Sequence, residues 1–314
     1  MSDIILSLGY DTERPHGAFA ESPSTRMAAR QTRSAQLSYI SRLNAQLDKM
    51  RVPRTFFMLG HFLERCLDDY TQDQLLDIFA PTNPLVDIQQ HSHSHPIIRP
   101  PSKGETGEPV TAEEFGRDVG KANRVAEDIL RVRPEGLRTP RGYDTDLSDR
   151  PDVLKVLRDE GIRFVSSDLR GVDSIDAPLT RARQPRTYEH AGVGDIVEVP
   201  SHGWQDVIFT KEKAQQLLGT QPAGPEYIVG HYTGLLDSAA KLADSGVSPV
   251  CISLCLHPWA ALEYDPALNI HTQLVDGAKD RGISIASYKS VASRVRSAHV
   301  AELRSMEGAI GGLL

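Results

Sequence analysis

The sequence has few cysteines, few aromatic residues and no long apolar run. Its 314 residues include 3 Cys, none in a C-x-x-C pair, and 6% aromatic residues. No stretch approaches the roughly 18–20 consecutive apolar residues that a membrane-spanning helix requires. The odd cysteine count is typical of buried thiols in a reducing compartment. We therefore expect neither a membrane protein nor a disulfide-stabilised one.

The chain also lacks an excess of positive charge. It has 35 Lys+Arg against 42 Asp+Glu, which gives a net charge of −7. Non-specific affinity for nucleic acid depends on clustered basic side chains, so a nucleic-acid partner is not expected. The N-terminal segment has no basic region, and Asp3 and Asp11 flank its short apolar run, unlike a signal peptide. These features predict a cytoplasmic protein that binds neither nucleic acid nor membranes.

Short apolar segments alternate with amphipathic ones along the whole chain. The segments expected to form strands are residues 4–9, 55–59, 85–89, 136–138, 163–166, 195–199, 250–256 and 283–286. Those expected to form helices are 34–49, 111–130 (opened by a capping box of Thr111 and Glu114), 151–160 and 268–281. Such alternation favours an α/β fold with a mainly parallel sheet covered by helices.

The chain length allows one barrel-like domain or two smaller ones. We predict a single catalytic domain over residues 1–314, with residues 295–314 as a C-terminal tail. The last residues of this tail could form a disordered end or a docking segment in a homo-oligomer.

The densest chemical signal is Gln89-Gln-His-Ser-His-Ser-His-Pro96, directly after an expected strand. His91 and His95 can bind one cation if the segment enters a helical turn, and His93 would then point elsewhere. The alternatives are a solvated polar loop, and a histidine-rich segment that binds metal weakly without catalysis. Three histidines within five residues favour metal ligation.

Other ionisable residues follow three further expected strands. Asp11 and Glu13 are two residues apart and share a face in an extended chain. Arg138 and His257 lie at two more strand ends. Taken singly, these could be a solvated acidic loop, a helix-capping arginine and a core histidine. Active sites in such folds gather where parallel strands end, so the group indicates a hydrolytic metal site.

In their order along the chain, several motifs resemble those of the polysaccharide deacetylases, which are carbohydrate esterase family four or the NodB homology domain. Residues 54–60 carry Arg-Thr-Phe-Phe-Met-Leu-Gly, and His91-Ser-His-Ser-His-Pro96 is similar to the family's H-[S/T]-x-x-H-P metal motif. Arg138-Thr-Pro140 resembles its R-x-P motif, and Leu254-Cys-Leu-His-Pro258 its L-x-H motif. The resemblance covers about residues 4–292.

The resemblance implies a distorted (β/α) barrel and a divalent metal, usually zinc, held by two histidines and a carboxylate. Co, Ni and Mn also suit these donors. The metal would polarise an amide carbonyl and activate water, while side chains move the protons. By position, the roles are Asp11 as base, Glu13, His91 and His95 as metal ligands, Arg138 as the partner of Asp11, and His257 as acid.

The sequence departs from the family pattern at two places. The family's adjacent Asp-Asp is Asp11-Thr-Glu13 here, so the roles of Asp11 and Glu13 could be exchanged. Arg141 replaces the tyrosine expected after R-x-P, and Tyr143 lies two residues further on. In the family, the backbone N–H at that position donates to the oxyanion of the tetrahedral intermediate. A backbone group can do this whatever the side chain is. The Arg141 guanidinium could assist it or bind a substrate carboxylate.

Two downstream segments resemble a cytosolic branch of the superfamily that contains allantoinase-like and cyclic-imide-hydrolysing enzymes. They are residues 161–168 and 196–206. Some members of this branch lack the metal carboxylates, whereas this chain keeps Asp11 and Glu13. His202 and Trp204 are candidates for the substrate wall, with simple packing as the alternative.

These observations predict a metal-dependent hydrolase of a non-peptide C–N bond. The substrate expected first is an N-acetylated amino sugar or another small N-acetyl compound of carbohydrate metabolism, including oligosaccharides. The alternatives are hydrolysis of a cyclic amide or imide, and a non-catalytic carbohydrate-binding protein.

Overall fold

The computed structural model describes residues 3–13, 23–100, 107–171, 176–215 and 219–311. These residues form a nine-stranded sheet in the order β10-β1-β2-β3-β4-β5-β8-β7, with β11 paired to β1. The strands are β1 (Ile4–Thr12), β2 (Arg54–Met58), β3 (Val86–Gln90), β4 (Gly136–Tyr143), β5 (Phe164–Asp168), β7 (Arg186–Tyr188), β8 (Val193–Glu198), β10 (Val250–Leu256) and β11 (Ser284–Ile285). All pairs are parallel except β7–β8. This confirms the predicted α/β fold with a mainly parallel sheet.

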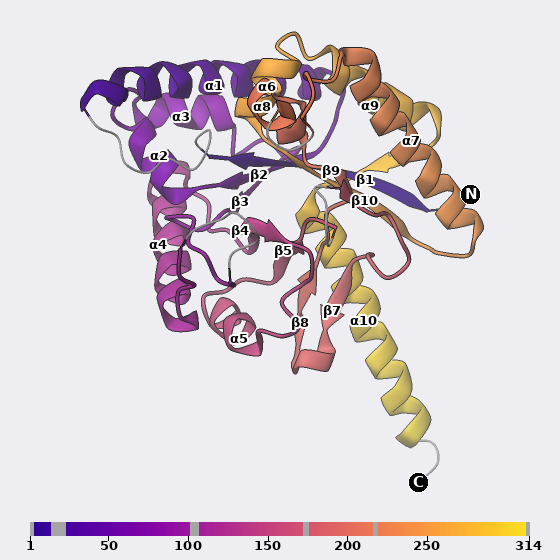
Figure 1. Ribbon diagram of the computed structural model, residues 1–314. Coiled ribbons are helices and arrows are strands. Elements are labelled where there is room, and N and C mark those ends of the chain that lie inside the picture. Colours follow the sequence, from indigo (N-terminus) through magenta and orange to yellow (C-terminus); the bar gives the residue numbers. More distant parts are fainter. Residues whose placement is uncertain (1–2, 14–22, 101–106, 172–175, 216–218, 312–314) are drawn as a thin grey trace.

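Helices surround this sheet (Figure 1). They are α1 (Pro23–Lys49), α2 (Gly60–Cys66), α3 (Gln72–Phe79), α4 (Ala112–Leu130), α5 (Pro151–Asp159), α6 (Lys211–Lys213), α7 (Pro225–Asp244), α8 (Pro258–Tyr264), α9 (Asn269–Asp280) and α10 (Tyr288–Gly311). A separate two-stranded sheet pairs β6 (Asp176–Ala177) with β9 (Gly203–Trp204). No helix among the described residues is both long and apolar enough to span a membrane.

The two ends of the described sheet, β7 and β10, do not pair with each other. The segment after β8 bridges this open side. The Ser201 N–H donates to the Asp168 carbonyl of β5, at 2.9 Å, and the His202 N–H donates to the Ser253 carbonyl of β10, at 2.8 Å. Backbone hydrogen bonds therefore link the two halves of a distorted, incompletely paired barrel.

Local sequence signals explain several elements directly. Leu37, Ile40 and Leu43 lie on one face of α1 and are fully buried, as their spacing predicts. The predicted capping box opens α4: the Thr111 hydroxyl accepts from the Glu114 N–H, and the Glu114 carboxylate accepts from the Thr111 N–H. Every residue of β1 is buried, as expected of a parallel strand covered on both faces.

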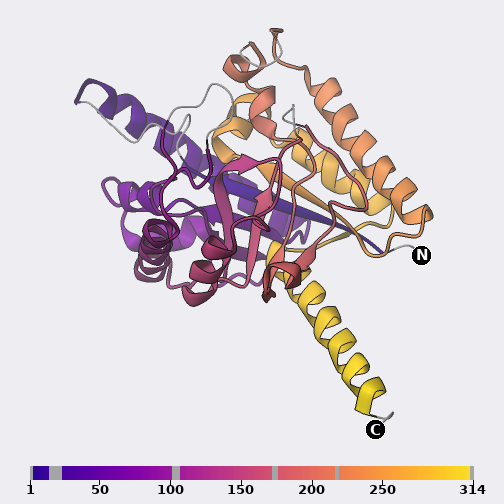
Figure 2. The same cartoon turned by 60° about the horizontal axis from the view of Figure 1, so that its bottom comes forward.

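The C-terminal helix α10 extends away from the rest of the chain in both views (Figures 1 and 2). Of the predicted tail at 295–314, residues 295–311 continue this helix without a break, and residues 312–314 lie outside the described residues. A single catalytic domain over residues 1–314 stays a prediction. The three cysteines are buried and form no disulfide bond.

Candidate active site

A cavity of about 320 Å³ lies at the carboxyl ends of β1, β4 and β10, beside the loop after β3. It brings together six of the residues predicted from the sequence, namely Asp11, Glu13, His91, His95, Arg141 and His257. Residues that the sequence analysis did not single out also line it, including Arg170, Gln205, Lys213, Cys255 and Trp259. Six separate chain segments thus converge on the cavity, and several of them follow the carboxyl ends of parallel strands.

Three side chains on one wall of the cavity could hold a metal ion. The Glu13 Oε2 lies 3.2 Å from the His95 Nε2 and 3.5 Å from the His91 Nε2. One ligand atom from each residue lies within 4.8 Å of the others. The His91 Nδ1–H donates to the Arg138 carbonyl at 2.9 Å, which leaves the Nε2 lone pair facing Glu13. Two imidazoles and a carboxylate, open to a cavity, suit a divalent metal with a remaining coordination position.

The segment between the two histidines is not helical, so the predicted helical turn is wrong. Ser92 and His95 have φ values of 65° and 60°, in the left-handed region. The His95 N–H donates to the Ser92 hydroxyl at 3.1 Å and closes the turn. This turn places the rings of His91 and His95 with centroids 4.9 Å apart. The ring of His93 instead contacts Glu64, with its Nε2 2.9 Å from the carboxylate.

The protonation states of Glu13 and His95 suit a metal, whereas the Asp11 and Glu13 carboxylates raise the pKa of His91 against the effect of burial. Burial raises the pKa of Glu13, but the nearby His95 and His91 lower it more, to about 2. Burial lowers the pKa of His95 to about 4, against the opposing effect of the Glu13 carboxylate. At neutral pH, Glu13 is an anion and His95 is a neutral imidazole. Metal ligands must be deprotonated in this way.

Asp11 is held in a buried ion pair beside the candidate metal ligands Glu13, His91 and His95. Its Oδ1 accepts from the Arg138 Nη1 at 2.8 Å, and both side chains are buried. The guanidinium lies 4.3 Å from the ring centroid of Phe57 and 4.9 Å from that of Tyr288. A Cβ at Gly9 would lie 2.7 Å from the Arg138 Nη2. Only glycine at position 9 therefore leaves room for this guanidinium.

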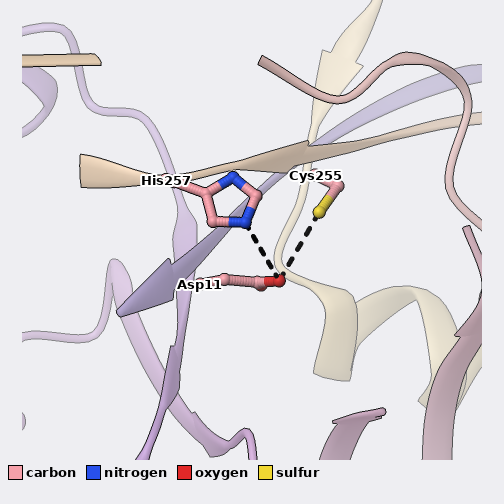
Figure 3. Close-up of side chains that lie close together, drawn as sticks. All are labelled: Asp11, Cys255 and His257. Carbon is pink, nitrogen blue, oxygen red and sulfur yellow. Dashed lines mark hydrogen bonds and ion pairs between the residues drawn. The ribbon is translucent and has the colours of Figure 1, made fainter. Parts of the chain in front are cut away.

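The second carboxylate oxygen of Asp11 faces the cavity. It lies 3.8 Å from the Nε2 of both His91 and His257. The Cys255 thiol donates to it at 3.5 Å (Figure 3). Asp11, Cys255 and His257 also lie close enough together to hold an ion. However, burial raises the pKa of Cys255 well above its ordinary value, which makes the thiol a poor metal ligand.

His257 is held by Asp206, which the sequence analysis did not identify. The Asp206 Oδ1 lies 2.7 Å from the His257 Nδ1, and its Oδ2 accepts from the His257 N–H and the Tyr264 hydroxyl. Burial lowers the pKa of His257, but the Asp206 carboxylate, with Asp11 and Glu13, raises it to about 9. His257 is therefore a cation at neutral pH with its Nε2 toward Asp11. Asp206 ends the 196–206 segment, and its pairing with His257 has no signature in the local sequence.

Three of the predicted substrate-binding residues do not line the cavity. The Tyr143 hydroxyl accepts from the Ile98 N–H, and its ring lies under the Arg99 guanidinium. His202 is buried, with its Nε2 2.6 Å from the Arg183 carbonyl and its Nδ1 accepting from the Ser253 N–H. Trp204 packs among aromatic rings, with its centroid 5.2 Å from that of His231. These contacts hold all three side chains in packing positions.

Comparisons with known proteins identify a related sequence family and a shared fold. Residues 37–165 match the sequence profile of the polysaccharide deacetylase family. A comparison with curated protein sequences found no match.

Three solved structures share the fold over more than nine-tenths of this chain. A provisionally assigned polysaccharide deacetylase from Mycobacterium smegmatis has 17% identity and a TM-score of 0.67, covering 95% of this chain and 92% of that one. The Puue allantoinase has 13% identity and a TM-score of 0.60, covering 95% and 92%. A further provisional polysaccharide deacetylase, from Pseudomonas aeruginosa PAO1, has 14% identity and a TM-score of 0.60, covering 93% and 90%. At these identities, the likeness concerns the fold.

Proposed function

Since this chain carries a polysaccharide deacetylase domain, as its motifs predicted, we propose that it is a metal-dependent hydrolase that removes an acetyl group from the nitrogen of a small substrate. One observation carries the proposal. Glu13, His91 and His95 present three donors to a cavity, and the Asp11–Arg138 and His257–Asp206 pairs lie beside them, with the His257 Nε2 3.8 Å from both Asp11 and Glu13. This arrangement combines a metal site with a base and an acid.

The metal would be held by Glu13, His91 and His95, with zinc as the first candidate. Glu13 is closer than Asp11 to the His91 Nε2, at 3.5 Å against 3.8 Å, which favours Glu13 as the metal carboxylate. When bound, the ion supplies Lewis-acid polarisation of the amide carbonyl and of the attacking water.

The proton transfers are assigned to Asp11 and His257. Asp11 takes the proton of the water, and the Arg138 guanidinium fixes the orientation of its carboxylate. His257 is protonated at neutral pH, and its Nε2 gives a proton to the departing amine. The backbone N–H of Arg141 is assigned to the oxyanion, as the family pattern implies.

The size of the cavity supports a small substrate. Its volume of about 320 Å³ is at the lower end of the range for small-molecule sites, which is roughly 300–1,000 Å³. We therefore favour a small N-acetyl compound over a long polymer. The cytoplasmic location and a role in carbohydrate metabolism stay predictions from the sequence.

A second candidate function is hydrolysis of a cyclic amide or imide by the same residues. The fold likeness to the Puue allantoinase supports it. A ring-opening reaction needs the same polarised carbonyl, base and acid, but both product groups stay on one molecule.

The product of the metal-loaded protein distinguishes these functions. We would incubate it with N-acetylated sugars and amines and with cyclic amides and imides, and follow the products by proton NMR. Release of acetate supports the deacetylase, and a ring-opened acid without acetate supports the second candidate. If the protein hydrolyses neither set of compounds, and His257→Ala binds them as tightly as the wild type does, a non-catalytic binding protein is favoured.

The Asp206→Asn variant is expected to lose activity at a lower pH than the wild type as the pH is raised. An acid must be protonated to act, so the rate falls as pH rises through its pKa. The Asp206 carboxylate contributes most to raising the pKa of His257 to about 9, so this pKa falls when the carboxylate is removed. We expect the alkaline limb of kcat/KM to move to lower pH by about 1–2 units.

A pH profile of the wild type, Asp206→Asn and Tyr264→Phe provides the measurement and its control. Tyr264→Phe removes one hydroxyl from the Asp206 Oδ2 but keeps the charge that faces His257. Its alkaline limb should stay close to that of the wild type. An unchanged limb in Asp206→Asn would reject His257 as the acid.

A further inference from the structure

Arg141 lies in the cavity on a strained piece of backbone. It belongs to the last part of β4, where the register with β5 shifts between Arg138 and Tyr143. Arg141 has a φ of 75°, and Gly142 follows with a φ of 65°. A residue with a side chain is strained in this region of backbone conformation, and the strain persists only where the surroundings enforce it.

The surroundings of this turn enforce its conformation. The Arg141 carbonyl accepts from the Arg170 guanidinium, and the Tyr143 carbonyl accepts from the backbone N–H groups of Leu169 and Arg170. A Cβ at Gly142 would lie 3.1 Å from both Gln205 and Leu169. The fold thus holds Arg141 at the cavity wall in spite of the strain.

The guanidinium of Arg141 has no protein counter-ion within the described parts of the chain. Its Nε is buried and lacks a hydrogen-bond acceptor there. The other arginine close to the metal-binding residues, Arg138, is paired with Asp11. Arg141 lines the same cavity as His95. A buried donor without an acceptor is costly, and binding of an anion would satisfy it.

The cavity wall around Arg141 carries mainly positive charge. Apart from Asp11, Glu13 and His257, which serve the proposed chemistry, its charged side chains are Arg141, Arg170, Lys213 and the exposed Glu212. The metal-binding residues would take the carbonyl of the scissile amide. The cationic wall lies within the same small cavity and suits a negatively charged group on the same molecule.

We propose that the substrate carries a carboxylate, and that Arg141 binds it. The proposal rests on the proposed amide hydrolysis for the other end of the molecule. Arg is well suited to a carboxylate because its planar fork can donate two parallel hydrogen bonds. The substrate class is therefore a small acylated amine, or cyclic amide, that bears a free acid group.

Isosteric substrate pairs test this specificity. We would compare N-acetyl-glycine, N-acetyl-β-alanine and N-acetyl-4-aminobutyrate with their primary amides, which differ from them in charge but hardly in shape. For the best-fitting spacing, the wild type should favour the acid in kcat/KM by about tenfold or more, the value of one hydrogen bond to a charged group. Arg141→Gln should bring the ratio close to one, and Arg141→Lys should restore part of it.

The control variant is Arg117→Gln, which removes an exposed arginine of α4 that pairs with Glu113. It should keep the preference of the wild type. A wild-type ratio near one for every pair would overturn the proposal. So would an equal loss for acid and amide in Arg141→Gln, because the guanidinium would then act on the oxyanion.

A binding measurement separates this proposal from the proposed function. In the Asp11→Asn background, in which turnover is slowed, calorimetric titration should show tighter binding of the acid than of the amide. That preference should disappear when Arg141→Gln is added. If the wild type hydrolyses no pair but this preference is found, the carboxylate site stands and the deacetylase proposal falls. Equal binding of the acid and the amide would reject the carboxylate site. If Arg141→Gln does not fold, Arg141→Lys takes its place in this comparison.

Discussion

Replacement of Asp11 with Asn is expected to lower kcat by about 10²–10⁴-fold, the usual contribution of a general base. Asparagine has the shape of aspartate and can still accept a hydrogen bond from Arg138, but it cannot take a proton from water. The change also leaves the Arg138 guanidinium, which is fully buried, without its counter-ion. Such a loss costs about 3–5 kcal/mol, so the variant should fold but melt at a lower temperature than the wild type.

Single-turnover kinetics and thermal unfolding together check this prediction. The matched control is Asp265→Asn, which alters a buried aspartate whose Oδ2 is 2.8 Å from the His271 Nδ1 and which does not line the cavity. It should lower the stability while keeping kcat. Near-normal turnover in Asp11→Asn would refute its role as the base. Glu13 would then be the candidate, with the two carboxylates in exchanged roles.

Replacement of His91 with Ala is expected to abolish metal binding and, with it, activity. The wild type should carry about one equivalent of a transition metal per chain, as three protein ligands are typical of a catalytic site. Without His91, Glu13 and His95 provide only two donors. Because protons compete for the imidazoles, the metal content of the wild type should also fall as the pH is lowered.

Elemental analysis after gel filtration measures this content. His93→Ala is the matched control, since it removes a histidine of the same motif whose ring contacts Glu64 instead of the metal-binding residues. It should retain the metal. Equal metal in the wild type and His91→Ala would reject the ligand set, and a wild type that does not bind added Zn, Co, Ni or Mn would reject the metal-dependent mechanism.

Much of the fold could be predicted because its signals are local. The expected strands at 4–9 and 250–256 correspond to β1 and β10, and the capping box of Thr111 opens α4 as predicted. Burial on both faces makes a parallel strand a continuous apolar run, and a cap depends on residues three positions apart. The very short strands β6, β7 and β9 were not predicted. Strands of two or three residues are defined by their partners, and their own sequence carries little pattern.

Part of the site could likewise be predicted from the sequence, and part of it could not. The sequence by itself determined the types of group at the strand ends, namely Asp11, Glu13, His91 and His257, because parallel strands bring their carboxyl ends to one edge. Only the tertiary structure decided how they meet. Contacts between distant segments decide three features of the site. These are the left-handed turn at Ser92 and His95, the pairing of Asp206 with His257, and the packing of His202 and Trp204 outside the cavity. Local sequence encodes backbone preference and burial, whereas the partner of a buried polar group is chosen by the packing of the whole chain.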